Sequence, residues 1–264
     1  MTLVGAGTGM GIRTALGLRG PFFEIGPKSR LRLAQLAVIA RAAGRAGREN
    51  GVDVVLTVPT AFIGPLHALD AGVLLFAQTM DPDPMGDGMG RVFAESLVDA
   101  GASGVMLNHD SNRLAAGTLI AVLQRADHCG LRTIVCADTE ADVEAIAALE
   151  PSAILFEPPA LIGTATTGER DWIGPIDERV RRRTPDVLMM HAGGVATPAI
   201  AHAIMRAGAD GTGSTSGVLT AEDPLIAARD FIAATRVGWD EARHLDSIRQ
   251  TSTSNGSRIE GEQR

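Results

Sequence analysis

Residues 153–164 read Ala-Ile-Leu-Phe-Glu-Pro-Pro-Ala-Leu-Ile-Gly-Thr, a stretch that indicates both a strand and a site at its end. The first four residues form a short apolar run bounded by turn residues, which is typical of a fully buried strand. Glu157 follows at the edge of a dry core, where desolvation raises a carboxyl pKa toward the range of a general base. Two prolines stiffen the start of the next loop and small residues leave its end free to move, so we expect a base beneath a closing lid. A solvated Glu in an ordinary proline turn fits these residues alone equally well.

Composition places the chain among ordinary globular proteins. It has 264 residues, of which 45% are hydrophobic and 21% charged, and a net charge of −7. The acidic balance argues against a nucleic-acid partner. The sequence shows neither an uncharged span long enough for a membrane nor a secretory signal, and its two cysteines make no disulfide framework. We therefore expect a cytoplasmic protein with no membrane partner.

Lys28 is the only lysine among 24 basic residues. An ammonium is a compact point charge that can approach a small anion closely, unlike the planar guanidinium of arginine. Its position just after a predicted strand favours a functional role over a residue left by drift.

Apolar runs and helical patterns alternate along the chain. Strands are predicted at 21–25, 53–58, 73–78, 104–107, 132–136, 153–156, 187–190 and 209–213. Helices are predicted from 33 to an end near 44–51 and at 91–100, 111–129, 139–149, 175–183, 197–207 and 221–239, with a short helix or loop at 60–69. Eight such repeats, with strands that are apolar on both faces, predict an α/β fold with a closed (β/α)8 TIM barrel, the competing architecture being an open doubly wound sheet.

The chain is expected to divide into three parts. Residues 1–20, with a Gly-rich run that lacks the strand a dinucleotide fingerprint needs, are predicted to form a flexible extension. Residues 21–240 are expected to form the catalytic barrel, and the polar residues 241–264 are predicted to be a disordered tail.

The chemically suggestive groups all follow strands. Lys28 follows the first strand, His109 the fourth and Glu157 the sixth, with Gly-rich turns after the seventh and eighth. In a barrel these strand ends share one rim, and turns after strands seven and eight commonly bind phosphate through backbone N–H groups. No metal site is predicted, because the six histidines lack ligand spacing.

Four segments resemble the archaeal-type branch of triosephosphate isomerase across residues 21–240. They are Glu157-Pro-Pro-Ala-Leu-Ile-Gly-Thr, Leu107-Asn-His-Asp-Ser-Asn-Arg113, Phe76-Ala-Gln-Thr-Met-Asp-Pro and Val135-Cys136. The resemblance implies an isomerase of glycolysis and gluconeogenesis that needs no cofactor, acts on a small phosphorylated sugar and assembles as a homo-oligomer, a dimer or tetramer.

The resemblance also implies roles for particular residues. Glu157 would move the proton, a neutral His109 would polarise the carbonyl, and Lys28 would stabilise the oxyanion and phosphate. The helix expected to begin at Ser111 would keep His109 neutral. Glu95 would support Lys28. The expected substrate-binding positions are Gly26, Lys28, Ile162, Gly163, Gly194, Thr215 and Ser216.

Two departures from the family pattern bear on the substrate. Gly26 stands where the family usually carries Asn, and the loop at Asp83–Gly88 differs from the usual pattern. The expected reaction is interconversion of dihydroxyacetone phosphate and glyceraldehyde 3-phosphate through an enediolate, and the alternative is the same chemistry on a four-carbon erythrulose phosphate. Two rivals of other classes are an aldolase using Lys28 as a Schiff base and a barrel that only binds a sugar phosphate.

Overall fold

The computed structural model describes residues 18–161, 164 and 170–261, and its core is a closed barrel of eight parallel strands. The strands are β1 (Phe22–Ile25), β2 (Asp53–Val58), β3 (Leu74–Ala77), β4 (Gly104–Leu107), β5 (Arg132–Ala137), β6 (Ala153–Phe156), β7 (Leu188–His191) and β8 (Gly211–Gly213). They pair in sequence order, and β1 pairs with β8 to close the ring. The predicted fold class is confirmed, and each strand boundary lies within two residues of its prediction.

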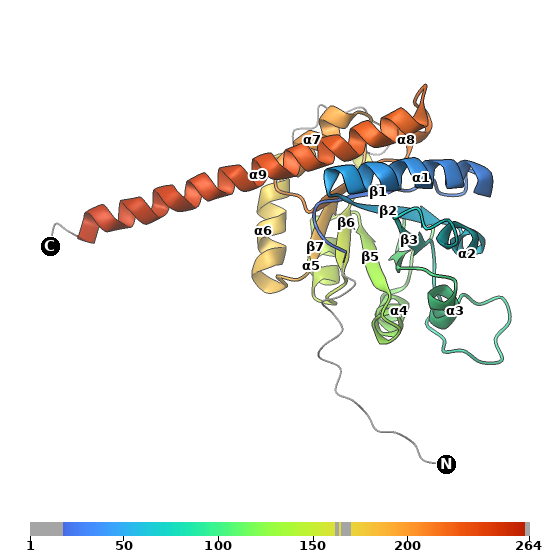
Figure 1. Ribbon diagram of the computed structural model, residues 1–264. Helices are drawn as coiled ribbons and strands as arrows, with labels where there is room; N and C mark the ends of the chain where they lie inside the picture. The colour runs from blue at the N-terminus through green and yellow to red at the C-terminus, as the bar shows by residue number, and fades with distance from the viewer. Residues whose placement is uncertain (1–17, 162–163, 165–169, 262–264) are drawn as a thin grey trace, which may run out of the picture.

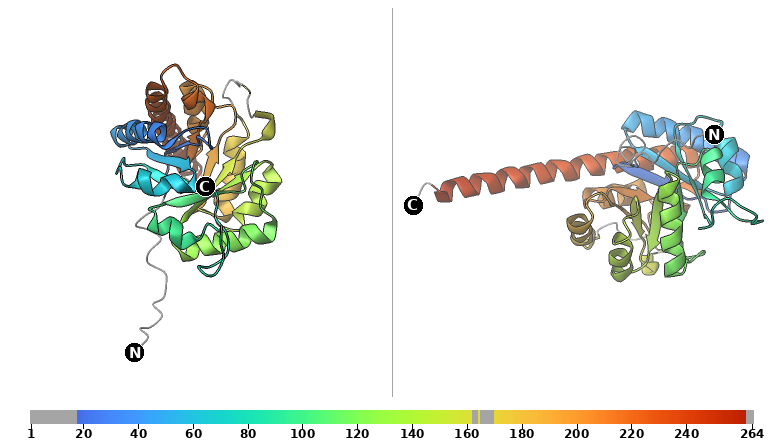
Figure 2. Two further views of the ribbon diagram at one scale, coloured as in Figure 1. Left: turned by 90° about the vertical axis from the view of Figure 1, so that its right-hand side faces the viewer. Right: turned by 90° about the horizontal axis from the view of Figure 1, so that it is seen from below.

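Helices surround the barrel, as the turned view in Figure 2 shows. They are α1 (Leu33–Asn50), α2 (Ile63–His67), α3 (Ala94–Asp99), α4 (Ala116–His128), α5 (Glu140–Ala147), α6 (Ile173–Arg183), α7 (Pro198–Arg206), α8 (Ser216–Leu219) and α9 (Pro224–Gly261), with two short 3₁₀ turns, η1 (Thr60–Phe62) and η2 (Pro159–Leu161). The strand residues that face outward pack against these helices in one large cluster.

A second, smaller cluster fills the barrel interior. It contains Phe22, Val55, Phe76, Met106 and Ile134 from successive strands, as expected when side chains alternate between the two faces of each strand. The two phenylalanines fit because glycines face them: a Cβ atom on Gly104 would lie 2.6 Å from the Phe76 ring, and one on Gly211 would overlap the Phe22 ring. Leu18 belongs to the same cluster, so residues 18–20 of the predicted extension are part of the fold, whereas the Gly-rich run lies outside the described residues.

Helices α3, α4 and α9 begin later than predicted, and hydrogen bonds before each helix show why. Asp81 accepts a hydrogen bond from Val92 N (2.6 Å) and donates its own N–H to Val92 O (2.9 Å), so α3 begins only at Ala94. The loop before α4 is held in a similar way, because the N–H groups of Ser111 and Leu114 donate to the side chains of His109 and Asn108. At the end of the chain, Asp223 Oδ1 accepts from the N–H groups of Leu225 and Ile226 and starts α9 after a break.

The last helix extends past its predicted end at Trp239 and continues through Gly261, where a disordered tail was predicted from residue 241. Arg243 stacks 4.0 Å over the Trp239 ring and Arg236 pairs with Asp240 one turn on, contacts that support the helix across the predicted boundary. Figure 1 shows α9 running beside α1 and α7 and then projecting away from the barrel. Among the described residues, no helix is both long and apolar enough to cross a membrane.

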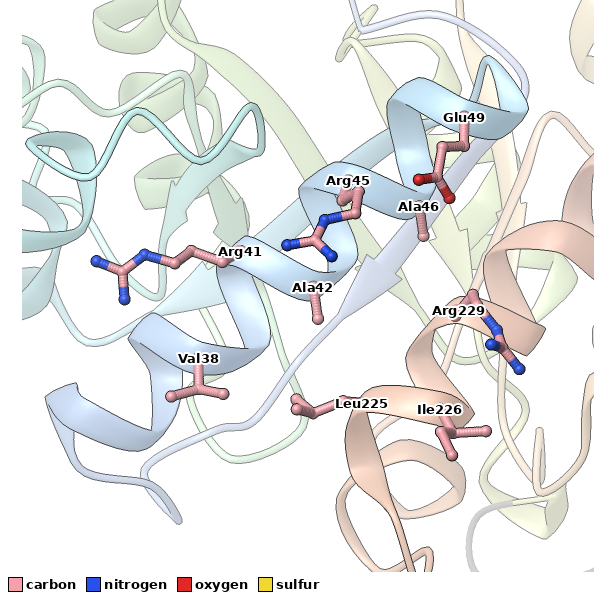
Figure 3. Close-up of a pocket in the computed structure, with 9 residues that line it drawn as sticks. All are labelled: Val38, Arg41, Ala42, Arg45, Ala46, Glu49, Leu225, Ile226 and Arg229. Atoms are coloured by element: carbon pink, nitrogen blue, oxygen red, sulfur yellow. The ribbon is translucent and has the colours of Figure 1, made fainter.

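An outer groove lies between α1 and α9, away from the strand ends (Figure 3). Val38 and Ala42 of α1 face Leu225 and Ile226 of α9, with Arg45 at its side. The groove contains none of the predicted site residues.

Candidate active site

A pocket of about 520 Å³ opens at the carboxyl ends of the strands. It is lined by every predicted site residue that the structure describes except Glu95: Gly26, Lys28, His109, Glu157, Gly194, Thr215 and Ser216. Ile162 and Gly163, the two remaining predicted positions, lie outside the described residues. The rim of the barrel therefore brings together side chains that are far apart in sequence, as parallel strands require.

Glu157 is positioned by strand β6. Its N–H donates to Ala137 O (3.0 Å), which extends the β5–β6 pairing by one residue and fixes the direction of the side chain. The carboxyl packs against Gly193, where a Cβ atom would lie 3.3 Å from Glu157 Cγ. Burial raises the pKa of this half-buried carboxyl, and the nearby Lys28 ammonium partly lowers it. Glu157 therefore has the environment of a carboxylate base stronger than one in water.

His109 is oriented by its neighbours in the turn after β4. Asn108 has a left-handed backbone (φ 58°), donates its amide to Cys136 O (3.0 Å) and accepts from Leu114 N (3.1 Å). The N–H of Ser111 donates to His109 Nδ1 (3.1 Å), and Ser111 Oγ lies 2.9 Å from the same atom. A ring nitrogen that accepts a backbone N–H carries no proton, so the neutral imidazole has its proton on Nε2.

The cause of the lowered histidine pKa differs from the prediction. Burial and then the Lys28 ammonium lower the pKa of His109. The helix expected at Ser111 begins only at Ala116, because the N–H groups of Ser111 and Leu114 are bonded to side chains of the turn. The imidazole is kept neutral by its surroundings within the pocket, and α4 begins seven residues further along the chain.

Lys28 occupies a strained backbone position after β1. Its φ is 53°, and its carbonyl accepts a hydrogen bond from Gln78 Nε2 (2.7 Å). A non-glycine residue in this region costs energy and persists only where the surroundings enforce it, often at functional sites. The ammonium is close enough to Glu157 and His109 to shift both of their pKa values.

The turns after β7 and β8 line the same side of the pocket as the turn after β1. Gly193 and Gly194 both have positive φ (82° and 65°), and a side chain on Gly194 would overlap Thr164 O in the segment above it. Thr215 donates its hydroxyl to Gly26 O (2.8 Å), which ties the β8 turn to the β1 turn. Ser216 begins the short helix α8 beside them. Bare backbone amides in such turns are suited to hold an anion.

Glu95, predicted to support Lys28, lies elsewhere. It sits on α3 outside the pocket and forms an ion pair with Arg125 of α4. A glutamate on an outer helix finds its nearest cation on the next helix of the ring, so the structure supports a packing role for this residue.

Two buried charged residues in or beside the pocket were not predicted from the sequence. Glu24 lies inside the barrel just below Gly26, is 6% exposed, and lines the pocket. Arg170 is buried beside the pocket, and its guanidinium donates to Ala192 O (2.6 Å) and to Gly193 O. The alternation Phe22, Glu24, Gly26 along β1 was a signal for the first, since it places a charge on the inner face. The sequence offers no comparable signal for Arg170.

Metal binding finds no support among the described residues: no group of three His, Cys, Asp or Glu side chains is placed to hold an ion. Cys136 lies buried inside the barrel, and burial raises its thiol pKa. A protonated buried thiol is inert, in keeping with a packing role.

Comparisons with known proteins agree with this geometry. A family model described as triosephosphate isomerase matches residues 28–234. The triosephosphate isomerase of Saccharolobus solfataricus is 31% identical over 189 residues, covering 71% of this chain and 83% of the relative, and that of Methanopyrus kandleri is 32% identical over 199 residues, covering 74% and 88%. The crystal structure of triosephosphate isomerase from Bartonella henselae has the same fold, with a TM-score of 0.64 at 19% identity over 82% of this chain and 98% of that one. The chain belongs to the triosephosphate isomerase family of enzymes.

Proposed function

We propose that this protein interconverts dihydroxyacetone phosphate and glyceraldehyde 3-phosphate by moving a proton between adjacent carbons. The observation that carries the proposal is the hydrogen bond from Ser111 N–H to His109 Nδ1, in the same pocket as Glu157. This bond leaves the proton of the neutral imidazole on Nε2, so the pocket offers a neutral N–H donor and the half-buried Glu157 carboxylate. Proton transfer next to a carbonyl requires such a pair.

In this mechanism Glu157 removes a proton from C1 of the ketose. The electron pair of the broken C–H bond forms the C1–C2 double bond, and the carbonyl electrons move to oxygen as an enediolate. Burial supports this step because it raises the pKa of Glu157 and strengthens the base. The oxygen on C2 then gains a proton and the hydroxyl on C1 loses one, so that the C1–O bond becomes the carbonyl. The electron pair of the C1–C2 double bond takes the proton back from the same carboxyl at C2, which gives the aldose and restores the carboxylate.

His109 Nε2–H donates to the carbonyl oxygen and Lys28 stabilises the negative charge that develops there. A neutral imidazole matches the weakly acidic enediol better than an imidazolium, and the lowered pKa of His109 keeps it neutral at pH 7. The phosphate is held by the amides around Gly194 and by Thr215 and Ser216, with Lys28 nearby.

Proton NMR in deuterium oxide tests the proposal. With dihydroxyacetone phosphate, we expect deuterium at C1 of the ketose and C2 of the aldose, together with formation of aldose, and expect Glu157→Gln to abolish both. A covalent adduct trapped on Lys28 by borohydride would support the aldolase instead. Tight phosphate binding with no exchange would leave a barrel that only binds its ligand.

A four-carbon erythrulose phosphate is the second candidate substrate, and one observation favours it. Gly26 has no side chain at the edge of the pocket, and a Cβ atom there would lie 2.8 Å from Glu24 Oε1, so the Glu24 carboxyl is left uncovered for a longer substrate. The same NMR experiment with an erythrulose phosphate separates the two, because exchange confined to the tetrulose would reject the triose as substrate.

A further inference from the structure

The pocket floor holds two buried polar atoms that the mechanism above does not use. Glu24 Oε1 on β1 and Thr57 Oγ1 on β2 form no hydrogen bond with any protein group in the described part of the chain. Both residues line the pocket, at 6% and 3% exposure. Buried polar atoms in native proteins are almost always paired, and an exception calls for a reason such as a bound ligand group.

The backbone at Gly26 opens the carboxyl of Glu24 to the pocket. A Cβ atom on Gly26 would lie 2.8 Å from Glu24 Oε1, so any side chain there would displace the carboxyl. Strand residues two apart face the same side and differ in depth by about 6.6 Å. Glu24 therefore lies one layer deeper in the barrel than Gly26, on the side away from the rim.

The surroundings of Glu24 favour a neutral hydrogen-bonding partner over a cation. Met106, Leu155 and buried Cys136 belong to the same interior cluster. Burial raises the pKa of Glu24 to about 7, and Glu157 adds to the rise, while Thr57 and Lys28 lower it. The Thr57 hydroxyl lies close enough to affect this pKa without a geometry that satisfies either atom. A substrate hydroxyl is both donor and acceptor and can pair with the two atoms at once.

The other residues of the pocket show which part of a substrate would reach the pair. Thr215 and Ser216 line the same pocket and follow β8, where barrels commonly bind phosphate. With the phosphate held there, the hydroxyl groups of the sugar are left to pair with Glu24, since a second anion beside a carboxylate is repelled.

We propose that Glu24 and Thr57 form a hydroxyl-binding subsite that selects sugar phosphates with one more hydroxyl-bearing carbon than a triose phosphate. This hydroxyl donates to Glu24 Oε1 and accepts from Thr57 Oγ1. The subsite determines specificity and takes no part in proton transfer. Its place in catalysis rests on the isomerase function proposed above, whereas its ability to bind a hydroxyl does not.

Two unreactive ligands test the subsite by calorimetry: glycerol 3-phosphate, and erythritol 4-phosphate, which has one more hydroxyl-bearing carbon. The wild type is expected to bind erythritol phosphate at least about tenfold more tightly, the effect of one well-placed hydrogen bond to a buried group. Glu24→Leu and Thr57→Val are each expected to remove most of this preference. Thr212→Val is the matched control, because Thr212 is a buried strand threonine outside the pocket whose hydroxyl already bonds His191 O (2.8 Å).

The outcomes separate the two proposals. A preference unchanged in both Glu24→Leu and Thr57→Val, or absent in the wild type, overturns the subsite even if isomerisation is observed. A preference that these variants remove, in a protein that exchanges deuterium into neither triose nor tetrulose, keeps the subsite and rejects the isomerase. If Glu24→Leu fails to fold, Thr57→Val decides alone, since it replaces a hydroxyl by a methyl group of similar size.

Discussion

Two buried carboxyls lie at opposite ends of the same barrel, and their surroundings differ in one respect. Asp210, before β8 at the closed end, accepts from Met189 N (2.9 Å) and from Arg181 (3.3 Å). Glu24, at the open end, has an oxygen with no protein partner. Burial raises the pKa of both groups, but only Asp210 has an arginine and a backbone amide that oppose the rise. Burial alone thus says little about function, and the missing partner is what points to a ligand.

The backbone shows a similar contrast. At the closed end, positive φ values occur where a helix ends and the chain turns into the next strand, at Gly130 and also at the non-glycine residues Asp70 and Glu150. At the open end, Lys28 and Asn108 adopt the same region after β1 and β4. Positive φ thus accompanies ordinary helix ends at one end of the barrel, whereas at the other it occurs beside the pocket, which Lys28 lines.

The largest expected effect comes from Glu157→Gln, which should lower kcat by about 10²–10⁴-fold because the amide cannot accept the proton. Stability should change little, since the shape of the side chain is kept. Steady-state kinetics and thermal unfolding of the same preparation give the two values. Glu140→Gln, which removes a surface partner of Arg179, is the control and should turn over like the wild type. Equal losses in both variants would remove Glu157 from the mechanism.

Glu24→Gln should stabilise the protein above pH 7 and leave it unchanged near pH 4. The folded-state pKa is about 7 and the reference value 4.5, so the folded protein holds the proton more tightly than the unfolded chain. The wild type therefore loses stability as the pH rises from 4.5 through 7, with Glu157 opposing ionisation and Lys28 favouring it. A shift of this size corresponds to about 3 kcal/mol, at 1.36 kcal/mol for each pKa unit.

Denaturant unfolding at pH 4, 6 and 8.5 measures this difference. The gap between Glu24→Gln and the wild type should widen with pH and reach its limit above pH 7. A gap that is constant across the range would mean that the carboxyl has the same pKa in the folded protein and in the unfolded chain, and the contrast with Asp210 would disappear.

Asp210→Ala should destabilise the protein by about 1–3 kcal/mol, because it leaves the buried N–H of Met189 without an acceptor. The affinity for glycerol 3-phosphate should stay at its wild-type value, since Asp210 lies at the end of the barrel away from the pocket. Chemical denaturation and calorimetry measure the two quantities. Loss of ligand affinity in a fully folded variant would show that the two ends of the barrel are coupled.

The fold could be predicted from the sequence because each strand and helix is indicated by residues that are neighbours along the chain. Each strand is a short apolar run, and alternation along it assigns one face to the interior, as Phe22 and Val55 illustrate. The open end follows from topology, since parallel strands bring their ends together. Lys28, His109 and Glu157 were found in this way and share one pocket in the structure.

The remaining features depend on contacts between distant residues. The alternation Phe22, Glu24, Gly26 places Glu24 on the inner face, but the closeness of Thr57 on the next strand is not visible in that run. The late start of α4 depends on backbone N–H groups that donate to the side chains of Asn108 and His109. The spacing of apolar residues along the sequence does not predict such bonds.

The smallest expected effect concerns the tautomer of His109. Both the N–H and the hydroxyl of Ser111 approach Nδ1, at 3.1 and 2.9 Å, and Ser111→Ala removes only the hydroxyl. The backbone N–H still accounts for the lone pair on Nδ1, so kcat should fall by less than about tenfold, the range of one neutral hydrogen bond. His109→Gln, which removes the donor itself, should cost about 10²–10³-fold. Steady-state kinetics with the proposed substrate measure both variants. If Ser111→Ala loses as much as His109→Gln, the hydroxyl rather than the backbone determines which ring nitrogen carries the proton. The tautomer of His109 would then depend on a hydroxyl that can rotate. The backbone turn at the open end of the barrel would not be what orients the imidazole.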